Sequence, residues 1–117
     1  MNAEQCGDIG PVVSAAVNEI ATVVVGVLTL TLFLPENHSL KGKRGVIKKI
    51  KARVANTFNV SIAECDGQDL WQRAVLGVCQ VGTDVSHVDG ALRQVVRFID
   101  DMQVAELGEE RIEVLHC

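Results

Sequence analysis

The first strongly patterned segment, from Val23 to Leu34, alternates between two sets of side chains. From position 28 onward one set consists entirely of leucines, Leu28, Leu30, Leu32 and Leu34. A period of two, combined with β-branched residues, predicts a β-strand whose leucine side faces the core. Pro35 ends this strand because a proline nitrogen cannot donate to the ladder.

The next segment changes to a helical period. Ser39 is a suitable N-cap for a helix from Leu40 to Ala55. One side of this helix is apolar, with Val46, Ile47, Ile50 and Val54. The opposite side is basic, with Lys41, Arg44, Lys48 and Lys51.

Alternation returns from Val60 to Cys65 and predicts a second strand. Asp66 and Gly67 supply the positive-φ residues of a tight hairpin turn, so the third strand, Leu70 to Val81, is expected to return antiparallel. A last strand is predicted within Val104 to Leu115, interrupted or turned near Gly108.

A second helix is predicted between the third and fourth strands. Ser86 and Asp89 have the spacing of a capping box that opens it, and Asp89 can pair with Arg93 one turn later. Its apolar residues recur at helical spacing, at Val88, Leu92, Val95, Ile99 and Met102.

The order strand, helix, strand, strand, helix, strand predicts an α+β protein of the ferredoxin-like βαββαβ type. Its four-stranded antiparallel sheet carries both helices on one face and leaves the other face open. Residues 22–117 form this single domain, and residues 1–21, punctuated by Gly7, Gly10 and Pro11, are expected to be a flexible N-terminal extension.

Charge is unevenly distributed along the chain. The total is only −4, but no acidic residue lies between Glu36 and Glu64. That interval holds seven basic residues, Lys41, Lys43, Arg44, Lys48, Lys49, Lys51 and Arg53. Such a basic block in an otherwise acidic chain suggests a negatively charged partner.

The start of the first helix breaks local rules. Lys41, Lys43 and Arg44 meet the positive end of the helix dipole, at a cost of about 0.3–1 kcal/mol each. Gly42 and Gly45 each cost about 1 kcal/mol relative to alanine. Two interpretations remain open: the helix start binds phosphate or another anion, or the basic side is simply solvated.

Trp71, the only tryptophan, stands among amides and charges. It is either a stacking platform for a base, with Gln68, Gln72 and Arg73 as hydrogen-bonding neighbours, or a structural cap on the sheet. In the second interpretation its indole N–H bonds a turn carbonyl, and Arg73 pairs with Glu64 or Asp66 across the hairpin. The sequence leaves both open.

Other chemistry is weakly supported. The four cysteines show no metal-ligand spacing, and the adjacent His116 and Cys117 are too few ligands. The three histidines form no catalytic set. Acyl-phosphate hydrolysis would need an anion-binding loop with a fixed arginine, and the stretch "LPENHSLKGKR" fits that requirement poorly. We therefore expect a non-enzymatic, cytoplasmic protein with reduced thiols, no cofactor, no metal and no membrane span.

Two unusual stretches carry a family resemblance. The first is S-L-K-x-K-R, from Ser39 to Arg44, and the second is Q-D-L-W-Q-R, from Gln68 to Arg73. Together with "VVGVLTLTLFLP" and "HVDGALRQVVRFID" they resemble the YlxP-like family of bacterial domains of unknown function. The resemblance implies a ferredoxin-like fold and a gene neighbourhood that includes translation factors. It implies no activity and no catalytic residue.

These observations lead to one functional hypothesis and one rival. The hypothesis is an accessory protein that contacts RNA or the ribosome. Its phosphate- or base-contacting residues would be Lys41, Lys43, Arg44, Lys48, Lys49, Lys51, Trp71, Gln72 and Arg73. The rival is a protein-interaction module that forms homo-oligomers through the open sheet face or an edge strand.

Overall fold

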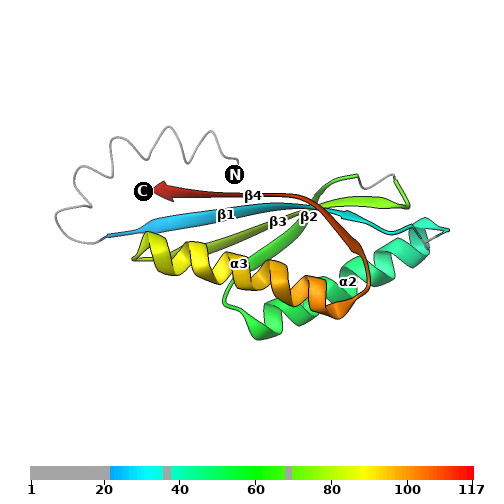
Figure 1. Ribbon diagram of the computed structural model, residues 1–117, viewed down its shortest axis with the longest axis horizontal. Helices are drawn as coiled ribbons and strands as arrows, with labels where there is room; N and C mark the ends of the chain where they lie inside the picture. The colour runs from blue at the N-terminus through cyan, green and yellow to red at the C-terminus, as the bar shows by residue number, and fades with distance from the viewer. Residues whose placement is uncertain (1–21, 36–37, 68–69) are drawn as a thin grey trace.

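The computed structural model describes residues 22–35, 38–67 and 70–117. Within them, four strands and two helices follow one another in the predicted order (Figure 1). The elements in chain order are β1 (Val24–Phe33), α2 (Leu40–Thr57), β2 (Ser61–Asp66), β3 (Arg73–Gly82), α3 (Val85–Met102) and β4 (Glu106–His116).

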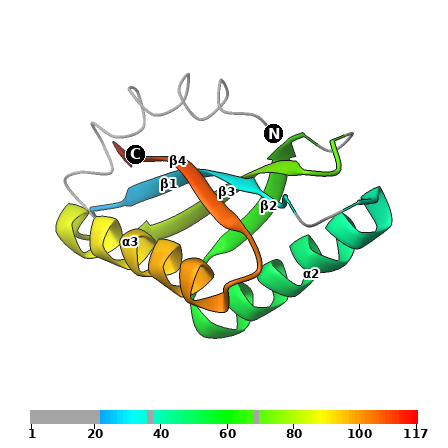
Figure 2. The same ribbon diagram turned by 45° about the vertical axis from the view of Figure 1, so that its right-hand side comes forward.

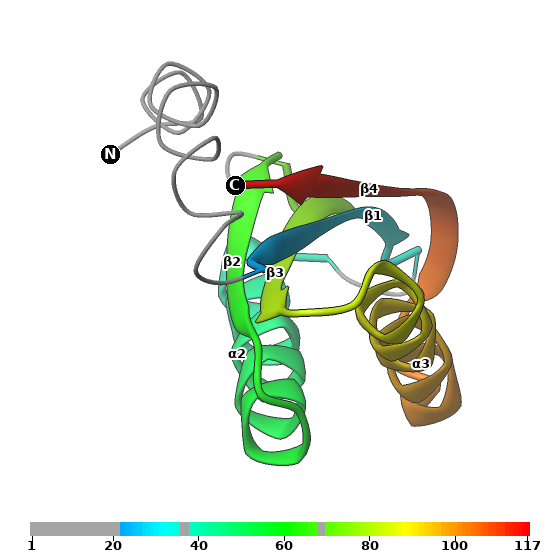
Figure 3. The ribbon, with the colours of Figure 1, turned by 90° about the vertical axis from the view of Figure 1, so that its left-hand side faces the viewer.

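The strands form one antiparallel sheet in the order β2-β3-β1-β4. Both helices cover the same face of this sheet, as the view in Figure 2 makes clear. The α+β ferredoxin-like fold with its open second face is therefore confirmed. The order makes β2 and β4 the two edges, and α2 runs alongside β2 (Figure 3).

The core lies between the sheet and the helices. The predicted leucine side of β1 is buried, with Leu28, Leu30 and Leu32 inaccessible to solvent. Each of them faces a core residue across the ladder; Leu28, for example, lies between Val78 and Ile112. A single alternating strand thus determines which side of the whole sheet is apolar, because paired residues point to the same face.

The helix starts confirm one predicted cap and correct the other. The Ser39 hydroxyl accepts a hydrogen bond from the Gly42 N–H at 3.0 Å, as an N-cap should. The second helix, however, is capped by Asp84, whose carboxylate accepts from the His87 N–H at 2.9 Å. The predicted cap Ser86 lies inside this helix, because the helix begins at Val85.

The predicted pair on the second helix is present. Arg93 donates to the Asp89 carboxylate at 2.8 Å. That hydrogen bond, and then the charge of Asp89, raises the pKa of Arg93 above its ordinary value. Both side chains lie at the surface or near it, so the pair orients α3 residues without adding much stability.

The predicted tight turn between the second and third strands is wrong. β2 ends at Asp66 and β3 begins only at Arg73, so residues 67–72 form a longer connection. Gly67 has the expected positive φ of 79°, but no positive φ occurs at Asp66. The reason is a side chain from α2 that holds the connection open, described below.

The last strand is continuous through Gly108, where a bulge replaces the predicted interruption. The register with β1 shifts between Leu30, opposite Glu110, and Leu32, opposite Leu107. Glycine at position 108 leaves room for the Phe33 ring, because an added Cβ would lie 2.6 Å from it.

Two further expectations concern the N-terminal extension and the absence of a membrane span. The predicted N-terminal extension, residues 1–21, lies outside the described residues. Neither α2 nor α3, the helices of the described part of the chain, is long and apolar enough to cross a membrane.

Candidate nucleic-acid interface

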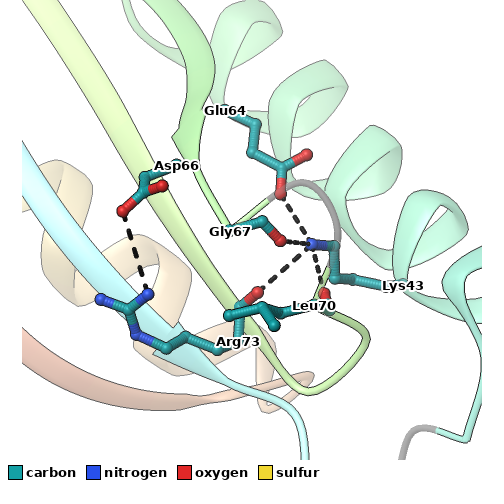
Figure 4. Close-up of polar contacts among 6 residues, drawn as sticks. All are labelled: Lys43, Glu64, Asp66, Gly67, Leu70 and Arg73. Carbon is teal, nitrogen blue, oxygen red and sulfur yellow. Dashed lines mark hydrogen bonds and ion pairs between the residues drawn. The ribbon is translucent and has the colours of Figure 1, made fainter.

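Lys43 is the most buried charged side chain of the described residues, although it belongs to the basic helix. Its exposed fraction is 1%, and its ammonium group points from α2 toward the connection between β2 and β3 (Figure 4). A lysine in such a place must find partners for all three N–H donors, since an unpaired buried charge is strongly destabilising.

The Lys43 ammonium group has four oxygen partners. It forms an ion pair with Glu64 at 2.9 Å. It also donates to the backbone carbonyl oxygens of Gly67, of Leu70 at 2.6 Å and of Arg73 at 3.2 Å (Figure 4). We call this arrangement the Lys43 clamp: one ammonium group, one carboxylate and three carbonyls.

The clamp explains the path of the described part of this connection, Gly67 and residues 70–72. Three carbonyls of a short segment converge on one cation, so the chain must curve around it instead of closing a two-residue turn. The Leu70 N–H also bonds the Gly67 carbonyl at 2.9 Å, and this bond closes the curve from within. The clamp therefore joins the S-L-K-x-K-R and Q-D-L-W-Q-R stretches, which the sequence analysis singled out separately, into one unit.

Further contacts attach this unit to the end of β1. The Leu34 N–H donates to the Gln72 carbonyl at 2.9 Å, and the Gln72 side chain donates to the Pro35 carbonyl at 3.3 Å. The rings of His38 and Trp71 meet edge to face, with centroids 6.4 Å apart. Trp71 thus lies beside the start of α2, with 46% of its surface exposed.

Lys43 must be removed from the predicted phosphate-binding set. Its charge is compensated by Glu64, and its donors are used by carbonyls of the same chain. A phosphate has no access to an ammonium group that is 1% exposed. The prediction placed it at the surface because neighbouring lysines are there.

The other predicted cations of α2 are placed differently. Lys41, Arg44, Lys48 and Lys49 are exposed, and Lys51 is half-buried. Within the described part of the chain, none of these five takes part in an ion pair. The basic side of α2 is therefore not neutralised by the acidic remainder of this protein, at least over residues 22–35, 38–67 and 70–117.

The remaining predicted site residues lie at one end of this basic side. Gln72 is exposed and Arg73 is half-buried. Arg73 approaches Asp66 at 4.0 Å, which agrees with one of the two partners expected for it, while Glu64 belongs to the Lys43 clamp. Gln68 and Asp69 lie outside the described residues.

Sequence reasoning missed the roles of Lys43 and Glu64, although a signal was present. Lys43 precedes Ile47, Ile50 and Val54 at intervals of a helical stripe, so it lies on the core side of α2. Glu64 likewise follows Ile62 by two positions and points to the helix-covered face. A lysine and a glutamate that both interrupt core-facing patterns are candidates for a buried pair.

Comparison with known proteins identifies the family of this chain. A family model described as "Protein of unknown function (DUF503)" matches residues 25–112. The chain is also 43% identical over 75 residues to "Uncharacterized protein YlxP" of Bacillus subtilis (strain 168), and the match covers 64% of this chain and 82% of that protein. The match to the family model spans both helices and all four strands, apart from the first residue of β1 and the last four residues of β4. The chain therefore belongs to the DUF503 family of proteins of unknown function, as the YlxP-like resemblance implied.

Proposed function

We propose that this protein is a non-enzymatic accessory factor that binds RNA, and in particular ribosomal RNA, through the exposed and half-buried cations of α2. The phosphate contacts are made by Lys41, Arg44, Lys48, Lys49 and Lys51. Trp71, Gln72 and Arg73, held at the start of the same helix, contact a base or a loop of the RNA.

One observation carries this proposal. Five cations lie along one helix and form no ion pair with any described residue of a chain whose net charge is −4. Mutual repulsion opposes this arrangement, and the helix dipole opposes the cations nearest the helix start, so a bound polyanion would relieve a cost that the free protein bears. The alternative interpretation, in which the basic side of the helix is only solvated, leaves that cost unexplained.

Two features near the helix start support the same conclusion. Gly45 lies in open space, with no atom within 4 Å of a Cβ added there. No contact in the described chain therefore requires a glycine, whereas close approach of a phosphate backbone would favour one. Trp71 offers an exposed ring that the connection between β2 and β3 holds beside these cations.

The proposal is tested by co-sedimentation with ribosomal subunits at low and moderate salt. The variant Lys41→Glu/Lys49→Glu reverses two exposed charges on α2. The matched control, Arg97→Glu/Arg111→Glu, makes the same change of charge on α3 and β4, where both arginines are exposed. We expect the α2 variant to lose most of its recovery and the control to behave like wild type.

Salt dependence gives a quantitative check. Each phosphate contact contributes roughly 0.7–0.9 to the slope of log affinity against log salt, so five contacts give a slope of about −4. The variant should reduce this slope by about 1.5. Equal recovery of wild type and α2 variant at both salt concentrations would rule the proposal out.

A second candidate function is self-association through the open sheet face. Val25 on β1 lies between Val81 on β3 and Leu115 on β4, and these three form an apolar row on that face. Val81 is 67% exposed and Leu115 is 44% exposed. Light scattering across a concentration series distinguishes the two functions, because a stable oligomer of wild type that Val81→Lys dissolves favours self-association.

A further inference from the structure

A groove runs along the outer flank of the molecule between α2 and β2. Its volume is about 630 Å³, and both elements contribute its walls. β2 is an edge of the sheet, so one side of its backbone pairs with β3 and the other side faces this flank (Figure 3). A groove between a helix and an edge strand has the geometry into which an added strand fits.

The side chains of the groove favour a particular kind of occupant. Its α2 wall carries three cations, Arg44, Lys48 and Lys51. Its floor is aliphatic, with Ala55, Val60 and Ile62 among the lining residues. The described lining contains no aromatic ring on which a nucleotide base would stack, so the groove itself suits a peptide better than a single-stranded RNA.

One carboxylate also lines the groove, that of Glu64. It lies 2.9 Å from the Lys43 ammonium group, so its charge is already compensated. The uncompensated charge along the groove is therefore positive.

The spacing of the cations matches that of an extended chain. Arg44 and Lys48 are separated by about 6 Å along the helix axis, given a rise of 1.5 Å per residue. Side chains on one face of a strand repeat about every 6.7 Å. Acidic residues two positions apart on a strand beside β2 would thus face successive cations of α2.

We propose that this groove binds an extended acidic peptide, which adds to the sheet as a strand beside β2. Backbone hydrogen bonds hold the peptide to the edge of β2 that pairs with no described strand. Carboxylates at alternate positions contact Arg44, Lys48 and Lys51, and aliphatic side chains cover the floor. This site goes beyond RNA binding; because it shares three cations with the RNA surface, peptide and RNA compete for them.

The test uses a synthetic peptide of about eight residues in which glutamate and valine alternate, with both ends blocked, titrated into the full chain. A second peptide has the same sequence but is N-methylated at every residue, so its charge is unchanged and its backbone donors are lost. We expect the N-methylated peptide to bind at least about tenfold more weakly, since several hydrogen bonds of about 1 kcal/mol each disappear.

Two protein variants separate the groove from the rest of α2. Lys48→Glu should weaken peptide binding by about three- to tenfold, whereas Arg53→Glu, the same change on an exposed residue outside the groove lining, should not. Ala55→Trp fills the groove without changing any charge. It should abolish peptide binding and leave recovery with ribosomal subunits unchanged.

Several results would overturn the proposal. No binding of the alternating peptide at millimolar concentration, or equal binding of its N-methylated form, would exclude strand addition. If Ala55→Trp weakened ribosome recovery but spared the peptide, the groove would be part of the RNA surface instead. Failure of the ribosome experiment alone, with the peptide results as expected, would leave the peptide site standing.

Discussion

Replacing Lys43 with methionine tests the physical basis of the candidate site. Methionine keeps a long unbranched side chain of similar helix propensity but removes the ammonium group. Glu64 then loses its ion pair at 2.9 Å, and the carbonyls of Gly67, Leu70 and Arg73 lose a charged donor. Breaking a fully buried ion pair on one side costs about 3–5 kcal/mol.

The expected cost for this chain is smaller, about 2–4 kcal/mol. The Glu64 side chain is 18% exposed although its Oε2 is buried, so a small shift would bring the carboxylate to water, and the freed carbonyls can be hydrated once the connection opens. A domain of this size has a total stability of about 5–15 kcal/mol, so Lys43→Met should remain folded but unfold at lower urea concentration.

Two measurements check this expectation. Urea denaturation followed by circular dichroism gives the change in the free energy of unfolding. Fluorescence reports on the connection itself, because Trp71 is the only tryptophan and the chain has no tyrosine. We expect a red-shifted Trp71 emission in the folded variant. A loss below about 1 kcal/mol together with an unchanged spectrum would refute the clamp.

A double-mutant cycle supplies the control. Glu64→Leu alone leaves the Lys43 charge with carbonyls only, whereas Lys43→Met/Glu64→Leu leaves neither charge behind. We expect the double variant to be more stable than the sum of the two single changes predicts, by about 1–3 kcal/mol. Additive losses would mean that the two side chains do not interact across the clamp.

Three further predictions concern the fold. Asp84→Ala should cost about 1 kcal/mol in urea denaturation, whereas Ser86→Ala should change stability by less than about 0.5 kcal/mol, because Asp84 is the cap. Gly45→Ala should stabilise the protein by up to about 1 kcal/mol, since its Cβ meets open space. Gly26→Ala should lower the thermal midpoint, at a cost of about 1–3 kcal/mol, because the new methyl group would lie 2.3 Å from Val88.

The sheet and its layers could be predicted because their signals are local and repeated. The leucines of β1 repeat with a period of two, and only one orientation of the strand buries them all. The capping error shows the limit of such signals. Thr83, Asp84 and Ser86 are all residues that can cap a helix, and the choice of Asp84 depends on where β3 ends, which local spacing does not encode.

The Lys43 clamp could not be predicted from the sequence, for a different reason. Three of the four partners of Lys43 are backbone carbonyls. Every residue has such a carbonyl, so the residue types in the sequence do not indicate which ones will bind the ammonium group. Their convergence depends on contacts between residues 24 to 30 positions apart. The apolar stripe that continues back from Ile47 to Lys43 indicated burial, but it did not indicate what the ammonium group would meet.

The position of the lysines has a practical consequence. All five lysines of the chain, Lys41, Lys43, Lys48, Lys49 and Lys51, lie on α2, and every other basic side chain except histidine is an arginine. Amine-directed chemistry, whether enzymatic acylation or a laboratory cross-linker, will therefore modify α2 in preference to any other element. Acylation would erase most of the positive charge of that helix in one kind of reaction. Lys43 should be the slowest to react, so its rate of labelling measures how often the connection between β2 and β3 comes open.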